Sequence, residues 1–299
     1  MKHEPIVSYR ESALNRNPAP LRYVTSRDNA TVKRLATLSH SAPARRRDGM
    51  CLLEGEHLAQ SYAQRARIAT LVLRGDEASA PTLSLADGSG GVSPHQLAPS
   101  HQRLVTASDE TIVLAPRLFD QLSALSTSSG VLAMAATPVS PPLATGGFVL
   151  ALDALQDPGN VGTLIRTAAA AGASQVWLSA GCAFAWSVKT LRASQGAHFH
   201  IDVIEAVELE TALVSFKGQR WATLPRPLPG MASSVVVHEF RQAKFAVDTV
   251  MILSNEGNGL SPSLYGAVTH GLSIPMQNGI ESLNVGVAGA LALYAVAGR

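Results

Sequence analysis

The segment Phe148-Val-Leu-Ala-Leu-Asp-Ala-Leu-Gln-Asp-Pro-Gly-Asn-Val-Gly-Thr-Leu-Ile-Arg166 carries the clearest structural pattern in this chain of 299 residues. Its first five residues form a continuous apolar run, which is typical of a strand buried on both faces of a parallel sheet. After a Pro-Gly turn, apolar residues recur at helical spacing from Asn160, which we expect to cap the helix. The segment therefore predicts a strand, a turn and a helix.

Further strands and helices follow towards the end of the chain. Val176-Trp-Leu178, Thr249-Val-Met-Ile-Leu253 and a run ending at Pro275 are predicted strands, and 188–193 is a predicted helix. From Ser282 the chain becomes apolar almost all round, which predicts a helix buried in the core or at an interface. Alternating buried strands and helices predict an α/β domain with a mostly parallel sheet.

Composition divides the chain into four parts. Residues 137–147, Thr137-Pro-Val-Ser-Pro-Pro-Leu-Ala-Thr-Gly-Gly147, are polar and rich in proline, which predicts a linker. We therefore expect a flexible tail at 1–20, a smaller α/β domain at 21–136 and a larger domain at 148–299.

Elements of the smaller domain are predicted from shorter patterns. Apolar spacing predicts a helix at 30–38, and short apolar runs predict strands at 71–73, 104–106 and 130–135. Residues 109–125 are predicted to be helical in parts. The Gly-, Ser- and Pro-rich stretch 75–100 is predicted to be an exposed loop.

Composition also excludes several classes of protein. Cys51 and Cys182 lie far apart without CxxC spacing, and the nine histidines show no ligand spacing, so we expect no disulfide and no metal site. No apolar run reaches the roughly 18 residues that a membrane span needs. The N-terminus lacks the apolar core of a secretory signal. We therefore expect a cytoplasmic protein with no membrane partner.

A nucleic-acid partner would have to bind a local basic patch, because the net charge is only +2. The stretch 21–47 is basic, with Asp28 as its only acidic residue. The alternative interpretation is a solvated charged arm. The residues that we expect to contact RNA phosphates are Arg22, Arg27, Lys33, Arg34, Arg45, Arg46 and Arg47.

Three motifs carry candidate functional residues. In the first, Arg166 can point into the crevice beyond the carboxyl ends of the strands, where open α/β sheets bind ligands. Gly159 and Gly162 do not form GxGxxG, which disfavours a nucleotide-dependent oxidoreductase. An ordinary strand-turn-helix with a solvated arginine remains the alternative.

The second and third motifs are polar loops that follow predicted strands. In Ile252-Leu-Ser-Asn-Glu-Gly-Asn-Gly-Leu260, the glycines allow the backbone to approach a ligand, and Glu256 is available to a cation. In Leu272-Ser-Ile-Pro-Met-Gln-Asn-Gly-Ile-Glu-Ser-Leu-Asn-Val285, Ser282 could cap the last helix, and Asn284 needs polar partners. Taken alone, the second motif could also be a polar surface turn.

Together the motifs resemble those of a known family. Asp157-Pro-Gly-Asn-Val-Gly162 with Arg166, Asn255-Glu-Gly-Asn-Gly-Leu260, and Ile274-Pro-Met276 with Ser282-Leu-Asn-Val285 resemble the three signature motifs of the SpoU (TrmH-like) ribose methyltransferases of the SPOUT superfamily. The resemblance spans residues 148–297. Thr25-Ser-Arg-Asp-Asn29, Leu53-Glu-Gly-Glu56 and Ser129-Gly-Val-Leu-Ala133 are similar to the substrate-binding domain that precedes many SpoU domains.

The resemblance implies an enzyme that transfers a methyl group from S-adenosylmethionine to a ribose 2′-hydroxyl of RNA. It also implies a deep C-terminal trefoil knot that forms the cofactor pocket, and a homodimer. Arg166 matches the catalytic arginine; because a guanidinium is a poor base, we expect it to act electrostatically. The other implied active-site residues are Asn160, Glu256, Ser282 and Asn284.

The resemblance also implies which residues contact the cofactor, and these lie in the second and third motifs. Ser254 stands where the family commonly has glycine, which puts that contact in doubt. The residues are Ser254, Gly257, Ile274, Met276 and Leu283. The long N-terminal part favours rRNA over tRNA as the substrate. The alternatives are a tRNA 2′-O-methyltransferase and a non-catalytic RNA-binding protein with the same fold.

Overall fold

The computed structural model describes residues 21–75, 91–92, 97–123, 129–224, 226, 228–255 and 259–298, and the predicted tail at 1–20 lies outside them. The chain divides into two compact units, which are described separately. The first comprises the described residues up to Pro138 together with Trp186–Val188, and the second comprises Val139–Ala185 and the described residues from Lys189 onwards. No helix in the described part of the chain is both long and apolar enough to cross a membrane.

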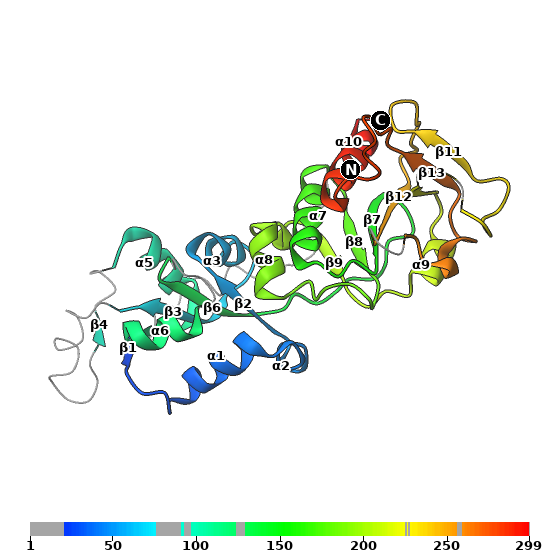
Figure 1. Ribbon diagram of the computed structural model, residues 1–299. Helices are drawn as coiled ribbons and strands as arrows, with labels where there is room; N and C mark the ends of the chain where they lie inside the picture. The colour runs from blue at the N-terminus through cyan, green and yellow to red at the C-terminus, as the bar shows by residue number, and fades with distance from the viewer. Residues whose placement is uncertain are drawn as a thin grey trace. The chain divides into compact units, whose positions relative to one another are not determined.

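The first unit contains a six-stranded mixed sheet with the order β2-β6-β3-β5-β1-β4 (Figure 1). β3, β5 and β1 are parallel to one another, while β2, β6 and β4 run antiparallel to their neighbours. The strands are β1 (Leu21–Val24), β2 (Met50–Glu54), β3 (Ile68–Arg74), β4 (Gly91–Val92), β5 (Ser108–Leu114) and β6 (Val131–Ala136), and the helices are α1 (Ala30–His40), α2 (Ala42–Asp48), α3 (Glu56–Ala63), α5 (Pro99–Thr106) and α6 (Pro116–Leu122).

Helix α1 forms where the apolar spacing predicted it. The side chain of Asn29 accepts hydrogen bonds from the backbone N–H groups of Thr31 and Val32, so it caps the helix. The buried face consists of Val32, Leu35 and Leu38. The predicted strands at 71–73 and 130–135 are also confirmed, as parts of β3 and β6.

Two predictions in the first unit are wrong. Residues 104–106, predicted as a strand, end helix α5, in which Leu104 and Val105 are buried. Residues 109–114, predicted to be partly helical, belong to strand β5 instead, and helix α6 begins only at Pro116. The physical reason is that an apolar run of three or four residues fits one helical turn as well as a short strand, so periodicity cannot distinguish them.

The second unit contains a seven-stranded sheet with the order β11-β13-β10-β12-β7-β8-β9. All of its strand pairs are parallel, as the buried apolar runs predicted. The strands are β7 (Phe148–Asp153), β8 (Gln175–Leu178), β9 (Asp202–Ile204), β10 (Gln219–Thr223), β11 (Val236–Glu239), β12 (Thr249–Ser254) and β13 (His270–Ser273), and the helices are α7 (Pro158–Ala170), α8 (Val188–Ser194), α9 (Leu209–Ser215) and α10 (Val285–Ala297), with short 3-10 turns at Ala197–Phe199 and Pro262–Leu264.

The core of this unit lies on both faces of its two central strands. All six residues of β7 and the first five of β12 are buried. On one face, Trp177 packs edge-on against Phe216 with ring centroids 6.2 Å apart, in a cluster that includes α9. On the other, α7 and α10 lie side by side (Figure 1), and Gly289 of α10 sits against Leu164 and Leu253. The two central strands are therefore covered on both faces.

A buried histidine lies near the end of α8. His198 is 3% exposed, its Nε2–H donates to the carbonyl of Ala185 at 2.9 Å, and its Nδ1 lies 2.7 Å from the Oγ of Ser194. Burial lowers the pKa of His198 to about 4, because the charged ring would lose its hydration. The imidazole is therefore neutral in the folded protein at physiological pH.

Candidate active site

The candidate active site lies at the carboxyl ends of β7 and β12. The two strands are parallel neighbours in the middle of the sheet, with Asp153 opposite Ser254 in the register. β8 and β9 lie on one side of this pair, and β10, β13 and β11 lie on the other. The chain first adds β8 and β9 on one side of β7 and then crosses to β10 on the other side. Such a reversal of the strand order opens a crevice at the carboxyl ends, where α/β sheets bind ligands. The first and second motifs follow these two strands.

The start of α7 differs from the prediction. Asp157 is the N-cap, and its Oδ1 accepts from the backbone N–H of Asn160 at 2.7 Å, so the prediction that Asn160 caps the helix is wrong. Asp157 stands immediately before Pro158, and proline favours the first helical position, so the sequence did contain a signal for this cap. The side chain of Asn160 therefore lies within the first turn and can contact other groups.

Asn160 meets the third motif. Its Oδ1 accepts a hydrogen bond from Nδ2 of Asn284 at 3.1 Å, between residues that are 124 positions apart. Asn284 also caps α10, because its Oδ1 accepts from the N–H of Gly286 at 2.9 Å. The alternative in which Ser282 caps this helix is therefore wrong, and α10 begins at Val285. The N-termini of α7 and α10 are joined by two asparagine side chains.

The remaining predicted active-site residues are placed less closely together. Ser282 is exposed in the loop before α10, and Arg166 is exposed one turn beyond Thr163 on α7. Among the described residues, no hydrogen bond links Arg166 to either asparagine. Glu256 and Gly257 lie outside the described part of the chain. The structure thus unites Asn160 with Asn284 and leaves Arg166 at the rim.

The predicted cofactor residues that the structure describes lie after β12, after β13 and before α10. Ser254 ends β12, and Ile274, Met276 and Leu283 belong to the loop between β13 and α10. All four are half-buried. Half-buried aliphatic side chains fit the apolar faces of an adenosine and a methionine chain, while strand-end backbone groups fit their polar edges. The residues present therefore fit S-adenosylmethionine.

In the first unit, the predicted RNA-contact residues differ in exposure. Arg45 is 6% exposed and donates through Nη1 to the carbonyls of Leu38, at the end of α1, and of Ser39, the latter at 3.3 Å. It therefore holds α1 and α2 together, and we withdraw it from the set. The other residues are all exposed, and they are Arg22, Arg27, Lys33, Arg34, Arg46 and Arg47.

Three of these exposed cations have acidic neighbours. Arg22 contacts Glu110, and Lys33 and Arg47 lie 2.9 Å from carboxylate oxygens of Asp28 and Asp48. Exposed ion pairs contribute about 0–1 kcal/mol, so a phosphate could exchange for the carboxylate at little cost. The ion pairs therefore do not prevent contact with RNA.

Comparison with known proteins identifies the family. The profile of the SpoU rRNA Methylase family matches residues 147–294. The 23S rRNA (guanosine(2553)-2′-O)-methyltransferase RlmP of Bacillus subtilis is 31% identical over 278 residues, which cover 93% of this chain and 100% of that protein. An uncharacterised tRNA/rRNA methyltransferase of Synechocystis is 30% identical over 293 residues, covering 91% of this chain and 92% of that protein.

Solved structures have the same fold. A proposed RNA methyltransferase of the TrmH family from Porphyromonas gingivalis matches with a TM-score of 0.68 and 26% identity, over 90% of this chain and 97% of that one. An rRNA methyltransferase from Sinorhizobium meliloti, at 24% identity, matches with a TM-score of 0.73 over 93% of this chain and 98% of that one. The family predicted from the three motifs is confirmed: the chain belongs to the SpoU family of RNA methyltransferases.

Proposed function

We propose that this enzyme transfers a methyl group from S-adenosylmethionine to a ribose 2′-hydroxyl of rRNA. The family membership supports the reaction, and the named activity of the Bacillus subtilis relative supports rRNA as the substrate. The observation that carries the proposal is the hydrogen bond between Asn160 and Asn284, which brings the first and third motifs together beside the central strands.

The two asparagines have complementary capacities for binding a ribose. The Asn284 Oδ1 and one of its N–H groups are used by Gly286 and Asn160, which leaves a second N–H on the same amide. Asn160 has its own amide N–H groups beside it. Together with the exposed hydroxyl of Ser282, these groups can hold the 2′- and 3′-hydroxyls of a nucleotide. We assign positioning of the ribose to these three residues.

Arg166 is assigned an electrostatic role. Its guanidinium is exposed on α7 and can bind the phosphate next to the target ribose in a bidentate manner. The same charge would stabilise negative charge that develops on the 2′-oxygen during methyl transfer. Glu256, in the second motif, is assigned to hold a cationic partner. Correct orientation is the main contribution that this site makes.

S-adenosylmethionine supplies the electrophilic methyl group when it is bound. We assign its binding to the residues that follow β12 and β13, where apolar side chains are half-buried and backbone groups are available. We also propose, from the family, that these segments form a trefoil knot. The assigned residues are Ser254, Gly257, Ile274, Met276 and Leu283.

Residues 21–136 are proposed to be an RNA substrate-binding domain, joined by the linker 137–147 to a methyltransferase domain at 148–299. The exposed cations of 22–47 would bind RNA phosphates, which fix the position of the RNA without reading its sequence. The proposal places the enzyme in the cytoplasm, with rRNA preferred to tRNA.

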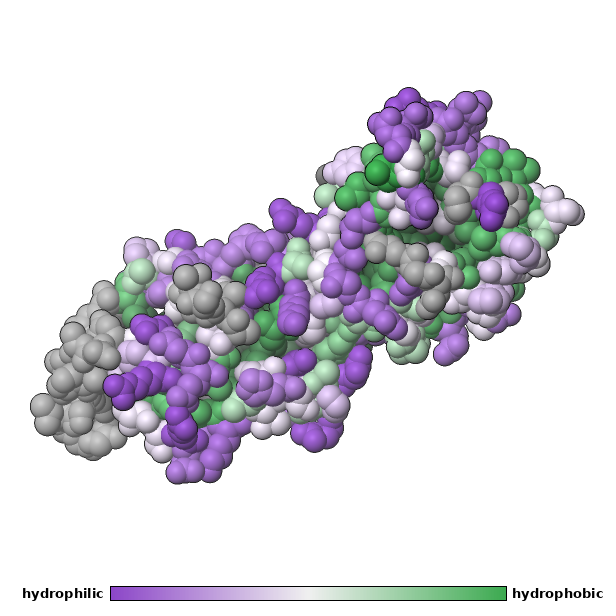
Figure 2. Space-filling model, in the orientation of Figure 1, coloured by the Kyte–Doolittle hydropathy of each residue, from purple (hydrophilic) through white to green (hydrophobic). Residues whose placement is uncertain are grey.

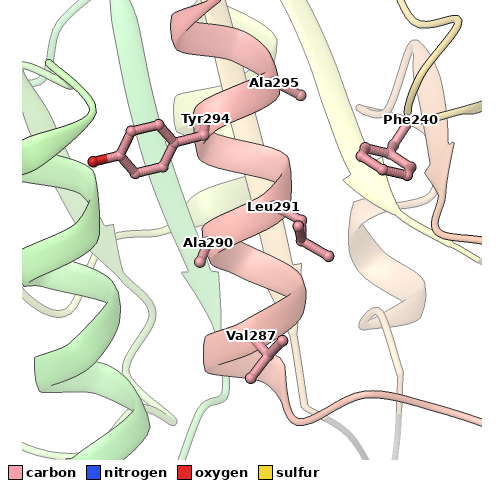
Figure 3. Close-up of a pocket in the computed structure, with 6 residues that line it drawn as sticks. All are labelled: Phe240, Val287, Ala290, Leu291, Tyr294 and Ala295. Atoms are coloured by element: carbon pink, nitrogen blue, oxygen red, sulfur yellow. The ribbon is translucent and has the colours of Figure 1, made fainter.

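A homodimer through α10 is part of the proposal. Figure 2 shows hydrophobic residues at the surface over this helix, where Val287 and Tyr294 are 51% and 57% exposed. Figure 3 shows Leu291 projecting from α10 towards Phe240, with Val287 one turn nearer the start of the helix, along a groove of about 470 Å³. The groove runs along the helix from Val287, in its first turn, to Ala295. A second copy of the chain would bury this apolar face.

Methyl transfer from radiolabelled S-adenosylmethionine to total RNA, separated into rRNA and tRNA, tests the function. We expect label in large rRNA with the wild type and a loss of about 100-fold with Arg166→Ala, comparable to the removal of one oxyanion donor. Lys217→Ala, at an exposed site at the opposite end of the sheet, is the matched control. Label in tRNA would show that tRNA, and not rRNA, is the substrate. If no RNA is labelled and the protein does not bind S-adenosylmethionine, a non-catalytic RNA-binding protein is favoured.

A further inference from the structure

A buried carboxylate lies where the motifs meet and has no role in the assignments above. Asp153, the last residue of β7, is 4% exposed. Its Oδ2 accepts from the backbone N–H of Ser261 at 2.8 Å, and its Oδ1 accepts from the Ser261 hydroxyl at 2.9 Å. Burial of an ionised carboxylate is unfavourable unless hydrogen bonds replace its hydration. These two bonds therefore tie Asp153 closely to Ser261.

The next residue, Ala154, contacts Asn255, which lies six positions before Ser261 in the second motif. Ala154 has a φ of 54°, in the left-handed region that alanine rarely adopts. Its carbonyl accepts from Nδ2 of Asn255 at 3.2 Å, and its N–H donates to the Oγ of Ser179 at 2.9 Å. Such a backbone conformation persists only where surrounding contacts maintain it. Asn255 and Ser179 supply those contacts.

Asn255 and Ser261 flank the loop of the second motif, residues 255–260. The loop is closed by a hydrogen bond from the N–H of Gly259 to the carbonyl of Asn255 at 2.9 Å. Asp153 therefore holds Ser261, just after the end of the motif, and Ala154 holds Asn255 at its start, although the motif lies about a hundred residues further along the chain. Asn255 and Ser261 are thus both fixed relative to the end of β7.

We propose that Asp153 is a positioning residue, which holds Ser261 and thereby keeps the carboxyl end of β12, at Ser254 and Asn255, in the arrangement that binds S-adenosylmethionine. This inference rests on the proposed function, which assigns Ser254, at the end of β12, to the cofactor. The carboxylate acts through Ser261 and the loop and does not itself contact the reacting atoms. Its loss would weaken cofactor binding because Ser261 and Asn255 would have to be fixed in place on binding.

Calorimetric titration of the full-length protein with S-adenosylmethionine alone tests this role. We expect Ser261→Ala to raise the Kd about tenfold, which corresponds to about 1.4 kcal/mol. Asp153→Asn leaves one acceptor oxygen for two donors and should also weaken binding. Ser261→Thr keeps the hydroxyl and should restore the wild-type affinity. The double variant, Asp153→Asn with Ser261→Ala, should have a Kd no higher than that of the weaker-binding single variant, because both substitutions remove the same interaction.

The matched control is Ser174→Ala. The Ser174 hydroxyl donates to the carbonyl of Phe148 at 3.0 Å, at the opposite end of the same strand. The Ser174→Ala substitution removes one hydroxyl hydrogen bond to β7 and leaves the contacts of Asn255 and Ser261 intact. It therefore measures the effect on cofactor binding of lost stability alone. Wild-type affinity in this control would show that weaker binding by Ser261→Ala is not a general consequence of destabilisation.

Hydrogen exchange of the ligand-free protein gives a second readout that needs no cofactor. The backbone amides of Gly259 and Ser261, which donate to Asn255 and Asp153, should exchange faster in Ser261→Ala and Asp153→Asn than in the wild type. In Ser174→Ala their exchange should be unchanged. If the wild type binds the cofactor and both variants bind equally well, the role of Asp153 is refuted while the proposed function stands. If the wild type binds no S-adenosylmethionine, the proposed function itself fails.

Discussion

Replacement of Gly162 by alanine tests the packing of α7 against α8. A Cβ atom at this position would lie 2.5 Å from the carbonyl oxygen of Thr190 and 2.6 Å from the Cβ of Ala193. The first distance is about 0.9 Å short of the 3.4 Å at which ordinary contacts begin. Because the obstacles are a backbone atom and a Cβ atom, no rotamer change can relieve the clash. The two helices would have to move apart.

Two opposing terms set the magnitude. In an exposed helix, alanine is more favourable than glycine by about 1 kcal/mol. Overpacking of a buried contact costs about 1–3 kcal/mol, and the rigid obstacles at Gly162 place this substitution at the upper end. We therefore expect a net destabilisation of about 2 kcal/mol, or a fall in Tm of roughly 5 °C for a domain of this size.

Thermal unfolding followed by circular dichroism measures this loss. Gly266→Ala is the control, because a Cβ at Gly266 would meet nothing within 4 Å and its backbone is not in the left-handed region. The control should unfold within about 0.5 kcal/mol of the wild type. If Gly162→Ala proves as stable as the wild type, the close packing of α7 on α8 is incorrect.

Because His198 is neutral when folded but charges in the unfolded chain, stability should fall as pH drops from 6.5 to about 4, by about 3 kcal/mol in total. Urea unfolding across this range should show the fall, and His198→Gln should show a flatter dependence; equal slopes would contradict it. Arg45→Ala should cost about 2 kcal/mol by removing charged hydrogen bonds to carbonyls, whereas Arg46→Ala should leave Tm unchanged but weaken RNA binding. Melting curves and binding isotherms at two salt concentrations separate the two arginines, and similar effects of both would refute this division. Val287→Asp should dissociate the dimer in light-scattering chromatography, while Val214→Asp, at a 67% exposed site on α9, should not; a monomeric wild type would refute the interface.

Several elements could be predicted because their signal is local. The apolar runs of β7 and β12 are long enough to exclude a solvated strand, and the spacing from Val161 to Ala168 matches one face of α7. The alternation of such runs with helices was sufficient to predict an α/β fold, because parallel strands are usually connected by helical crossovers. The motif residues were then recognisable as those of a known family.

Other elements could not be predicted because their apolar runs are short. Part of helix α5 was predicted as a strand, and strand β5 was predicted to be partly helical. No element was predicted where β10, β11 and α9 form. In such segments the tertiary contacts choose between helix and strand, since either one could bury two or three apolar side chains. Asn160 was wrongly predicted as a cap for a related reason. Asp157 and Asn160 lie three positions apart and both side chains can cap a helix, so the cap depends on where the helix begins.

The sequence alone determined which polar segments follow the buried strands of the second unit, because these depend on spacing within a few residues, although it misplaced the caps of α7 and α10. It could not show that Asn160 meets Asn284, nor that Asp153 holds Ser261, because each pair is separated by more than a hundred residues. Those contacts depend on the strand order, which places β12 beside β7 although four strands and three α-helices intervene in the chain. Strand order is fixed by the burial of whole faces at once, and no local pattern records it.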